Sequence, residues 1–236
     1  MADEYEYIRK NLTDVHRDIE LAAIRSGRKS EDITLIAVSK TVDIPAIESA
    51  AKLGMDHFGE NRVQEYLRKE QILSKELNWH FIGRIQTNKV KLLAGKDVLI
   101  HSLDRVELLN EMGRVAHSKN VKWRVLIEVN VANEKAKAGV SPQELLSFVQ
   151  MASASGVIEV LGLMTVAPYD DNPENSRIVF RQLKELSIDI KSKKLDNVFM
   201  RFLSMGMSND FIVAIEEGAT HVRVGTAIFG KRDYSK

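Results

Sequence analysis

The alternation of two kinds of segment constrains the fold of this chain more than any single motif. Amphipathic segments, with apolar residues three and four positions apart, alternate with short apolar runs that look like buried strands. One helix comes first, at about residues 3–26, and eight strand–helix units follow at about residues 33–232. That order is typical of a (β/α)8 barrel, whose usual size is about 250 residues. We therefore predict an α/β fold, a single TIM barrel domain over residues 1–236 with an extra N-terminal helix.

The individual elements can be placed from apolar runs and helix caps. Ser141 is a candidate N-cap and Glu144 completes a capping box, which predicts a helix over residues 141–152. The alternative fold, a doubly wound open sheet, usually carries G-x-G-x-x-G after its first strand, where this chain has Ser39-Lys40-Thr41. The barrel is therefore favoured. Its strands are predicted at residues 33–38, 55–61, 79–83, 98–101, 122–131, 157–166, 199–206 and 221–230, with further helices at 43–54, 62–73, 87–94, 106–116, 173–190 and 208–218.

Charge and composition exclude several classes of partner and chemistry. The 34 Lys and Arg residues nearly match the 33 Asp and Glu residues, so the net charge of +1 does not predict binding to nucleic acid. No apolar stretch approaches the roughly 18–20 residues that span a bilayer, and the charged N-terminus has no secretory h-region. Cysteine is absent, which excludes disulfides and thiolate metal sites. We expect a cytoplasmic protein with no metal that binds neither membranes nor nucleic acid.

Polar residues collect where the predicted strands end, which is where the chemistry of a barrel is found. Lys40 follows the first strand, and Arg223 lies on the last, which neighbours the first in a closed ring. Ser204 ends the seventh strand, and Gly225 and Thr226 follow the eighth. The loops after strands seven and eight are the frequent phosphate site of such barrels, because free backbone N–H groups and hydroxyls converge there. An amine, an arginine and a phosphate site should therefore share one mouth.

Two chemistries fit this set of residues. A lysine with a lowered pKa is an amine nucleophile that forms a Schiff base with an aldehyde. A phosphorylated aldehyde held in this way could be pyridoxal 5′-phosphate (PLP). The competing and weaker hypothesis is a class I aldolase, whose lysine forms an imine with a sugar phosphate on the same barrel with the same loops.

Seven motifs resemble those of one known family. They are AVSKT, HFGENRVQE, WHFIGRIQTNK, LIEVNVANEKAKAG, GLMTV, LSMGMSNDF and THVRVGTAIFGKR, spread over residues 33–232. Together they are similar to the pyridoxal phosphate homeostasis proteins, also called the proline synthetase co-transcribed family, which are related to the barrel domain of alanine racemase. The resemblance implies a fold-type III PLP-binding barrel.

The resemblance also implies roles for individual residues. Lys40 matches the Schiff-base lysine, and Arg223 matches the arginine that contacts the pyridine nitrogen. The remaining cofactor-binding positions are Ser204, Gly225 and Thr226 for the phosphate, with Asn61 and His80 lining the cofactor. Arg84, Asn88 and Lys137 also fall in the motifs, where a structural or loop role is expected.

The function implied is PLP binding in vitamin B6 homeostasis, with no established catalytic residue or turnover. An arginine on the pyridine nitrogen keeps that nitrogen unprotonated, which makes the ring a weak electron sink. The first hypothesis is therefore a monomeric PLP carrier that supplies PLP-dependent apoenzymes, and we lean against an enzyme. The alternative is an amino-acid racemase-like enzyme of weak activity, which would need two bases. Tyr234, in a predicted tail, is a poor candidate for one of them.

Overall fold

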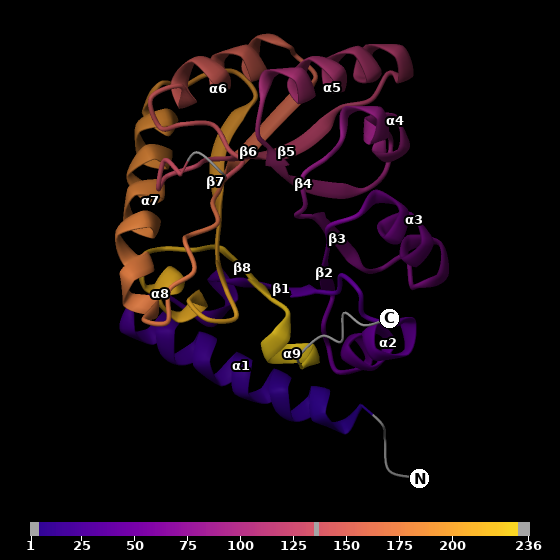
Figure 1. Cartoon of the computed structure of the whole chain (residues 1–236), viewed down its shortest axis with the longest axis vertical. Helices are drawn as coiled ribbons and strands as arrows, with labels where there is room; N and C mark the ends of the chain where they lie inside the picture. The colour runs from indigo at the N-terminus through magenta and orange to yellow at the C-terminus, as the bar shows by residue number, and fades with distance from the viewer. Residues whose placement is uncertain (1–4, 135–136, 231–236) are drawn as a thin grey trace.

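The computed structural model describes residues 5–134 and 137–230, and within them eight parallel strands close into a barrel in chain order. The pairing of the first strand with the last closes the ring, with Ile36 beside Arg223 and Ala37 beside Val224. The predicted TIM barrel is confirmed (Figure 1). The strands are β1 (Thr34–Val38), β2 (His57–Glu60), β3 (Asn78–Phe81), β4 (Val98–Leu103), β5 (Trp123–Glu128), β6 (Ile158–Met164), β7 (Val198–Met207) and β8 (His221–Val224).

Helices surround the ring, and the first of them lies across one side of it (Figure 1). Helix α1 runs beside α8 and α9, where Asn11 Nδ2 donates to the Ile228 carbonyl at 2.9 Å and Arg25 pairs with Glu216 at 2.7 Å. The helices are α1 (Glu6–Arg25), α2 (Ile44–Lys52), α3 (Val63–Ile72), α4 (Val90–Leu93), α5 (Val106–Lys119), α6 (Leu145–Ala154), α7 (Arg177–Ser192), α8 (Phe211–Glu216) and α9 (Thr226–Phe229), with 3-10 turns at Ser30–Asp32, Thr87–Lys89 and Pro173–Ser176.

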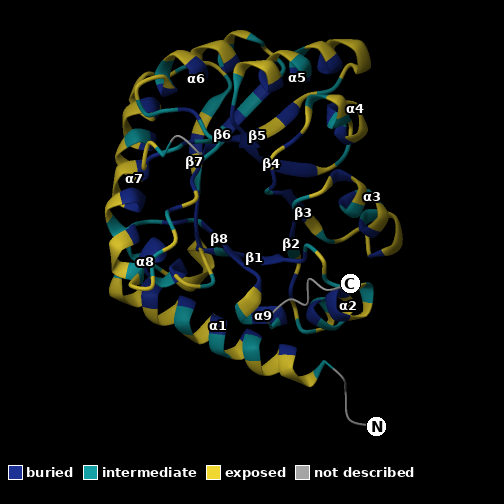
Figure 2. Ribbon diagram, in the orientation of Figure 1, coloured by how far each residue is buried: buried dark blue, intermediate teal, exposed yellow. Residues whose placement is uncertain are grey.

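Two apolar regions hold the barrel together. The larger lies between the strands and the inward faces of the helices, which are buried while their outward faces are exposed (Figure 2). The smaller lies on the other face of the strands and consists of Leu99, Leu126 and Met164. The strands that carry these residues, β4, β5 and β6, also contribute side chains to the larger region. Successive side chains therefore alternate between the two faces of the sheet.

Several predicted boundaries were wrong, most clearly at the eighth strand. Residues 226–229 form α9 instead of continuing β8, because the N–H groups of Ile228 and Phe229 donate to the Gly225 carbonyl. The seventh strand extends to Met207, past the predicted end. Helix α6 begins at Leu145, and the expected Ser141–Glu144 hydrogen bonds form in the turn before it. Residues 3–4 and 231–232 of the predicted ranges lie outside the described residues.

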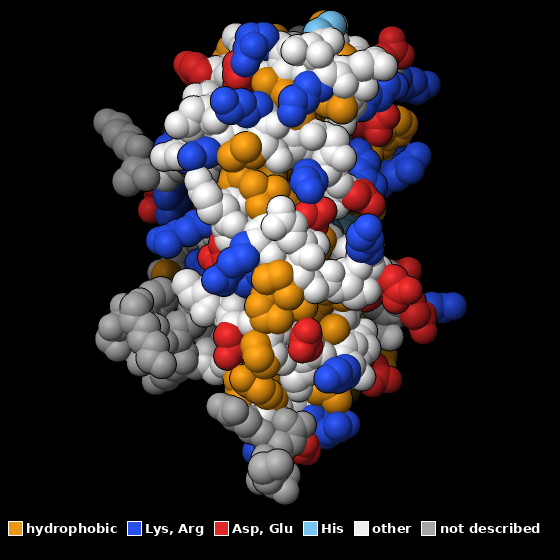
Figure 3. All heavy atoms as spheres, turned by 90° about the vertical axis from the view of Figure 1, so that its right-hand side faces the viewer, with side chains coloured by type: hydrophobic (Ala, Val, Ile, Leu, Met, Phe, Trp, Pro, Cys, Tyr) orange, Lys and Arg blue, Asp and Glu red, His pale blue; other side chains and the backbone are white. Residues whose placement is uncertain are grey.

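The surface of the described residues has two features that bear on partners. No helix among them is both long enough and apolar enough to cross a bilayer. On the face that carries α3 and α4, basic and acidic side chains are interspersed with apolar ones (Figure 3).

Candidate functional site

Lys40 lies in a tight turn directly after β1. The N–H of Val42 donates to the Ser39 carbonyl at 2.9 Å, which makes Lys40 and Thr41 the two central residues of the turn. Thr41 has a φ of 62°, the left-handed conformation that type II turns require at this position and usually fill with glycine. A β-branched residue is strained there. Lys40, half-buried, is therefore presented by a backbone that the surroundings must hold in place.

A cluster of buried charged side chains holds the backbone around Lys40 in place. The Lys69 ammonium, with 0% of its side chain exposed, donates to the Ser39 carbonyl at 2.7 Å, to Glu60 Oε1 at 2.8 Å and to Glu65 Oε1 at 2.7 Å. Glu65 Oε1 also accepts the Thr41 N–H at 2.7 Å, and Ser39 Oγ donates to Glu60 Oε1 at 2.7 Å. One buried lysine thus fixes the chain on both sides of Lys40.

Sequence reasoning missed this cluster, although the sequence carried a signal for it. Val63, Tyr66 and Lys69 follow one another at steps of three on the buried face of α3. A lysine on an apolar stripe is almost never fully buried without a partner. The partner is Glu60, at the end of the neighbouring strand β2. Burial raises the pKa of the Glu60 carboxyl, and the hydrogen bonds from Lys69 and Ser39 lower it.

Arg223 lies inside the barrel with 4% of its surface exposed. Its Nη1 donates to Ser204 Oγ at 2.6 Å and its Nη2 to the Thr165 carbonyl at 2.8 Å. Burial lowers the pKa of Arg223 to about 10, against the effect of Glu128 and Asp210. The guanidinium stays charged at neutral pH and, as a group that only donates hydrogen bonds, can receive only an acceptor from a ligand.

Ser204 does not lie with the phosphate loops, where the sequence analysis placed it. It is fully buried, three residues before the end of β7, and Arg223 and His101 occupy its hydroxyl. Ser208 lies there instead, and its Oγ accepts from the N–H groups of Gly225 at 3.2 Å and Ala227 at 3.4 Å. Ser204 was chosen from the sequence for two reasons, an early estimate of where the strand ends and the family resemblance.

The loop after β8 presents the other two predicted phosphate residues. Gly225 is buried and its N–H is held by Ser208, while Thr226 is exposed at the start of α9. Two backbone N–H groups and two hydroxyls therefore gather beside the site. An anion could replace Ser208 Oγ as the acceptor for both N–H groups.

Asn61 follows β2, close against the loop after β3. A side-chain carbon on Gly83 would lie 2.4 Å from the Asn61 carbonyl, so only glycine allows the two loops to meet. Asn61 Oδ1 is buried without a hydrogen-bond partner among the described residues. This oxygen is therefore available to accept a hydrogen bond from a ligand.

His80 lies on β3, and its predicted contact with the cofactor stays a prediction. It is 4% exposed, and both of its ring nitrogens are engaged, by His57 at 2.8 Å and by His101 at 2.9 Å. Its contact with Arg223 runs through His101 and Ser204, so this geometry does not bring His80 directly against a ligand.

Glu128, at the end of β5, was not singled out from the sequence. Burial, together with the Asp104 carboxylate, raises its pKa to about 7, although Arg223 and Arg84 act in the opposite direction. Arg84 itself pairs with Asp104 at 2.9 Å. A carboxyl group that titrates near neutrality beside a ligand-facing arginine is a candidate proton donor or acceptor.

The other motif residues have structural partners or fall outside the site. Lys137 pairs with Glu134 at 2.8 Å, and Asn88 lies in the 3-10 turn of residues 87–89. Tyr234 lies outside the described residues.

The fold and site together define a class of barrel. The family model described as alanine racemase, N-terminal domain, matches residues 20–233. The structure of alanine racemase from Streptomyces lavendulae superimposes with a TM-score of 0.77, covering 97% of this chain and 58% of that one at 16% identity. At that identity the likeness shows the fold alone.

Closer relatives narrow the class to one family. The pyridoxal phosphate homeostasis protein of Aquifex aeolicus is 48% identical over 226 residues, which cover 95% of this chain and 98% of the relative. The structure of PipY from Synechococcus elongatus with PLP bound has a TM-score of 0.77 and 32% identity, covering 90% of this chain and 99% of that one. This chain belongs to the pyridoxal phosphate homeostasis protein family, as its motifs predicted.

Proposed function

We propose that this protein binds PLP at the barrel mouth in the service of vitamin B6 homeostasis, and that Lys40 holds the cofactor as a Schiff base. The observation that carries the proposal is the pairing of β1 with β8, which places Lys40, Arg223 and the Gly225 loop at one end of two neighbouring strands. The PLP-bound structure of PipY and the name of the Aquifex relative support it.

The donor set fits this cofactor. A pyridine nitrogen is an acceptor, which suits Arg223, and a phosphate is an acceptor for the N–H groups of Gly225 and Ala227. Ser208 and Thr226 add hydroxyls, whereas the unpaired atom of Asn61 is Oδ1, an acceptor that does not belong to this donor set. In this proposal Ser208, in place of Ser204, has the phosphate role predicted from the sequence.

When PLP is bound, its aldehyde is the electrophile, and the residues of the chain bind and orient the cofactor. Lys40 would hold the cofactor through its amine, with a C=N bond in place of the aldehyde C=O and one water molecule released. Arg223 keeps a positive charge at the ring nitrogen, which disfavours protonation there and weakens the ring as an electron sink. We therefore propose a single PLP-binding domain that stores and transfers the cofactor and does not turn over amino acids.

Absorbance and chemical trapping test the binding proposal. The purified protein should be yellow, and borohydride reduction should fix the cofactor to Lys40, as shown by peptide mapping. Lys40→Ala should remove the trapped product, whereas Lys52→Ala, at an exposed lysine of α2, should leave it unchanged. A Lys40→Ala variant that binds PLP as tightly as the wild type would contradict the proposal.

Two further measurements separate a carrier from the racemase alternative. Incubation with L-alanine and other amino acids should leave optical purity intact, and turnover on the order of 1 s⁻¹ would establish an enzyme instead.

We also propose that the protein works in the cytoplasm as a monomer and passes PLP to apoenzymes. Light scattering should then give a mass near 26.7 kDa. An apo-enzyme mixed with the loaded protein should gain activity faster than free release of PLP allows.

A further inference from the structure

A cavity of about 320 Å³ lies at the mouth of the barrel, between the beginning of α3 and the loop that follows β3. Its charged side chains are all cationic, and they are Arg62, Arg84 and Lys89. None of the described residues in its wall is an Asp or a Glu. A concave wall with charges of one sign concentrates ions of the opposite sign, so this cavity attracts anions.

Two of the three cations lack a partner. The side chains of Arg62 and Lys89 form no ion pair or hydrogen bond with other described residues. Arg84 Nε pairs with the buried carboxylate of Asp104 at 2.9 Å, so the charge of Arg84 is at least partly balanced. At least two positive charges therefore remain unbalanced in the wall of the cavity.

Arg62 stands where a helix cap is expected. It is the N-cap residue of α3, its backbone is extended, and no side chain caps the helix. Ser, Thr, Asp or Asn is usual at this position, and the helix dipole opposes a cation there. Glu65, the acid in the first turn, pairs with Lys69 at 2.7 Å instead. An anion in the cavity would offset the cost of Arg62, because it would pair with the guanidinium and accept from the N–H groups that begin the helix.

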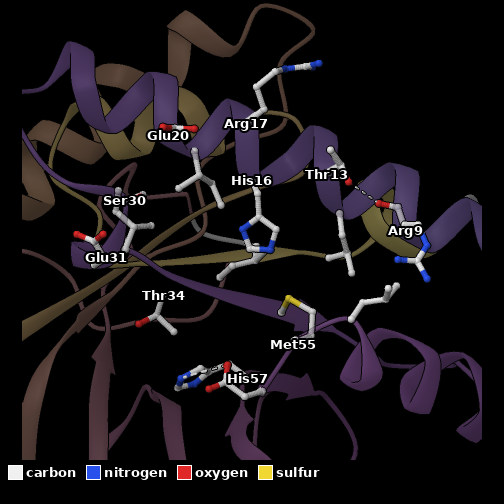
Figure 4. Close-up of a pocket in the computed structure, with 17 residues that line it drawn as sticks. Arg9, Thr13, His16, Arg17, Glu20, Ser30, Glu31, Thr34, Met55 and His57 are labelled. Carbon is white, nitrogen blue, oxygen red and sulfur yellow. Dashed lines mark hydrogen bonds and ion pairs between the residues drawn. The ribbon is translucent and has the colours of Figure 1, made fainter.

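A second cavity, between α1 and the amino-terminal ends of β1 and β2, has a different balance of charge. It measures about 800 Å³, and Figure 4 shows Glu20 in its wall together with Arg9 and Arg17. Both arginines already pair within α1, Arg9 with Glu6 at 3.4 Å and Arg17 with Asp14 at 3.1 Å. The unbalanced positive charge is therefore particular to the cavity at α3.

We propose that the cavity at α3 binds a small phosphate monoester that carries hydroxyl groups. Such a group has a charge of about −1.5 to −2 at pH 7, which matches the two unbalanced cations. The arginines would donate hydrogen bonds to the phosphate oxygens, and Lys89 would add a point charge. The buried Oδ1 of Asn61, which lacks a donor, would accept from a hydroxyl group of the ester.

This site is distinct from the phosphate site proposed for PLP. The PLP phosphate is assigned to the loops after β7 and β8, whereas the cavity lies after β2 and β3. In the closed ring, β1 stands between these two pairs of strands. Binding in the cavity therefore does not depend on whether the chain binds PLP.

Titration calorimetry with glycerol 3-phosphate measures the site directly. In protein whose Lys40 carries borohydride-trapped PLP, one glycerol 3-phosphate should still bind per chain, and its Kd should rise with salt. Inorganic phosphate should bind more weakly because it has no hydroxyl groups on carbon. Succinate that bound as tightly as glycerol 3-phosphate would overturn the phosphate assignment, and the lack of saturable binding would overturn the site.

Matched double variants locate the bound anion. Arg62→Gln with Lys89→Gln should raise the Kd for glycerol 3-phosphate by about tenfold or more, because two charged contacts are lost. Arg68→Gln with Lys91→Gln removes the same net charge from exposed positions of α3 and α4 outside the cavity, and should leave the Kd unchanged. Equal weakening in the two double variants would mean that net charge alone attracts the anion, which would refute the site.

Amide NMR of the wild type locates the anion without any substitution. Glycerol 3-phosphate should shift the backbone N–H signals of Val63 and Gln64 and the side-chain amide of Asn61. Shifts confined to Gly225 and Ala227 would place the anion at the loop after β8 and overturn the proposal.

The two proposals can fail separately. If Lys40 is not modified and PLP does not bind, the proposed function fails. Binding of glycerol 3-phosphate to Ser208→Ala at the wild-type Kd would then still support the cavity at α3. If PLP is trapped on Lys40 while glycerol 3-phosphate does not bind, only the second site fails.

Discussion

Lys69 Nζ donates a 2.7 Å hydrogen bond to the carbonyl oxygen of Ser39, the residue that precedes Lys40. Through Glu65 the same ammonium also secures the N–H of Thr41, the residue that follows. Lys40, the proposed cofactor lysine, is therefore held from both sides by a second lysine, Lys69. This arrangement explains how a threonine can persist at a φ of 62°.

Removing Lys69 should loosen this support and destabilise the protein. Lys69→Met leaves the Glu60 carboxylate buried without its cation, which costs about 3–5 kcal/mol of unfolding free energy. The double variant Lys69→Met, Glu60→Gln should recover part of that loss in urea titrations. In both variants borohydride should trap less cofactor on Lys40 per bound PLP. Full trapping in the double variant would show that the turn holds its shape without the cluster.

Ser208→Ala should weaken binding of the phosphate group specifically. The change removes a hydroxyl from the anion site and an acceptor from two backbone N–H groups. We expect the Kd for PLP to rise by roughly 10- to 150-fold, which corresponds to a lost charge-assisted hydrogen bond of about 1.5–3 kcal/mol. The Kd for pyridoxal, which has no phosphate, should stay unchanged. Equal weakening for both ligands would place Ser208 elsewhere in the site.

Arg223→Glu should change the reactivity of the bound cofactor. A carboxylate in place of the guanidinium favours a protonated pyridine nitrogen, which makes the ring a better electron sink. Incubation with L-alanine should then give slow transamination, detected as pyridoxamine phosphate by chromatography. Arg223→Met, which removes the charge without adding a carboxylate, should produce much less. If the two variants react alike, the charge at this position does not control the chemistry.

The dependence of stability on pH should report Glu128. Its pKa is raised from 4.5 to about 7 in the folded protein, so between these values the folded state binds its proton more tightly than the unfolded state does. The stability from that proton is present below about pH 4.5 and is lost as the pH rises through about 7. Glu128→Gln should therefore be more stable than wild type at pH 8, by on the order of 1–3 kcal/mol.

The matched control for that comparison is Glu107→Gln, at an exposed glutamate of α5. Its urea midpoints should follow those of wild type across the same pH range. Parallel curves for wild type and Glu128→Gln would mean that Glu128 titrates normally.

Gly83→Ala should separate the loops that meet at Asn61. The added carbon would lie 2.4 Å from the Asn61 carbonyl, closer than real contacts allow, so the backbone must move at a cost of about 1–3 kcal/mol. Because the two loops move apart, the affinity for PLP should also fall. Gly113→Ala, inside α5 with no atom within 4 Å of the new carbon, should instead stabilise the protein by up to about 1 kcal/mol. Thermal unfolding of the two variants makes the comparison.

The barrel could be predicted because its signals are local and repeated. Apolar periodicity placed α1, and its stripe of Ile8, Leu12, Val15 and Ile19 is buried as expected. The boundary of β8 could not be read in the same way, because TAIF is as apolar as a strand and only the hydrogen bonds to the Gly225 carbonyl make it helical. The local pattern of apolar residues does not show where these hydrogen bonds form.

Predicting the site from sequence had a similar limit. That Lys40, directly after β1, lies near Arg223 on β8 follows from the pairing of the first and last strands in any closed ring; their roles in binding stay a prediction. Which serine faces the phosphate loops depends on where β7 ends, and the structure extends that strand to Met207. The role of Lys69 and the links between the histidines of β2, β3 and β4 depend on contacts between distant elements, for which burial and distances are needed.

The pairing of β1 with β8 also sets a condition on when the protein can take up its cofactor during synthesis. Lys40 leaves the ribosome early, whereas Arg223 and the Gly225 loop come close to the end of translation. Contacts between such distant segments form slowly, because a long loop must close first. A nascent chain therefore exposes the amine without the groups that would retain PLP. If Lys40, Arg223 and the Gly225 loop hold PLP as proposed, uptake of the cofactor would require both ends of the barrel sequence, and unfinished chains should take up little of this reactive aldehyde.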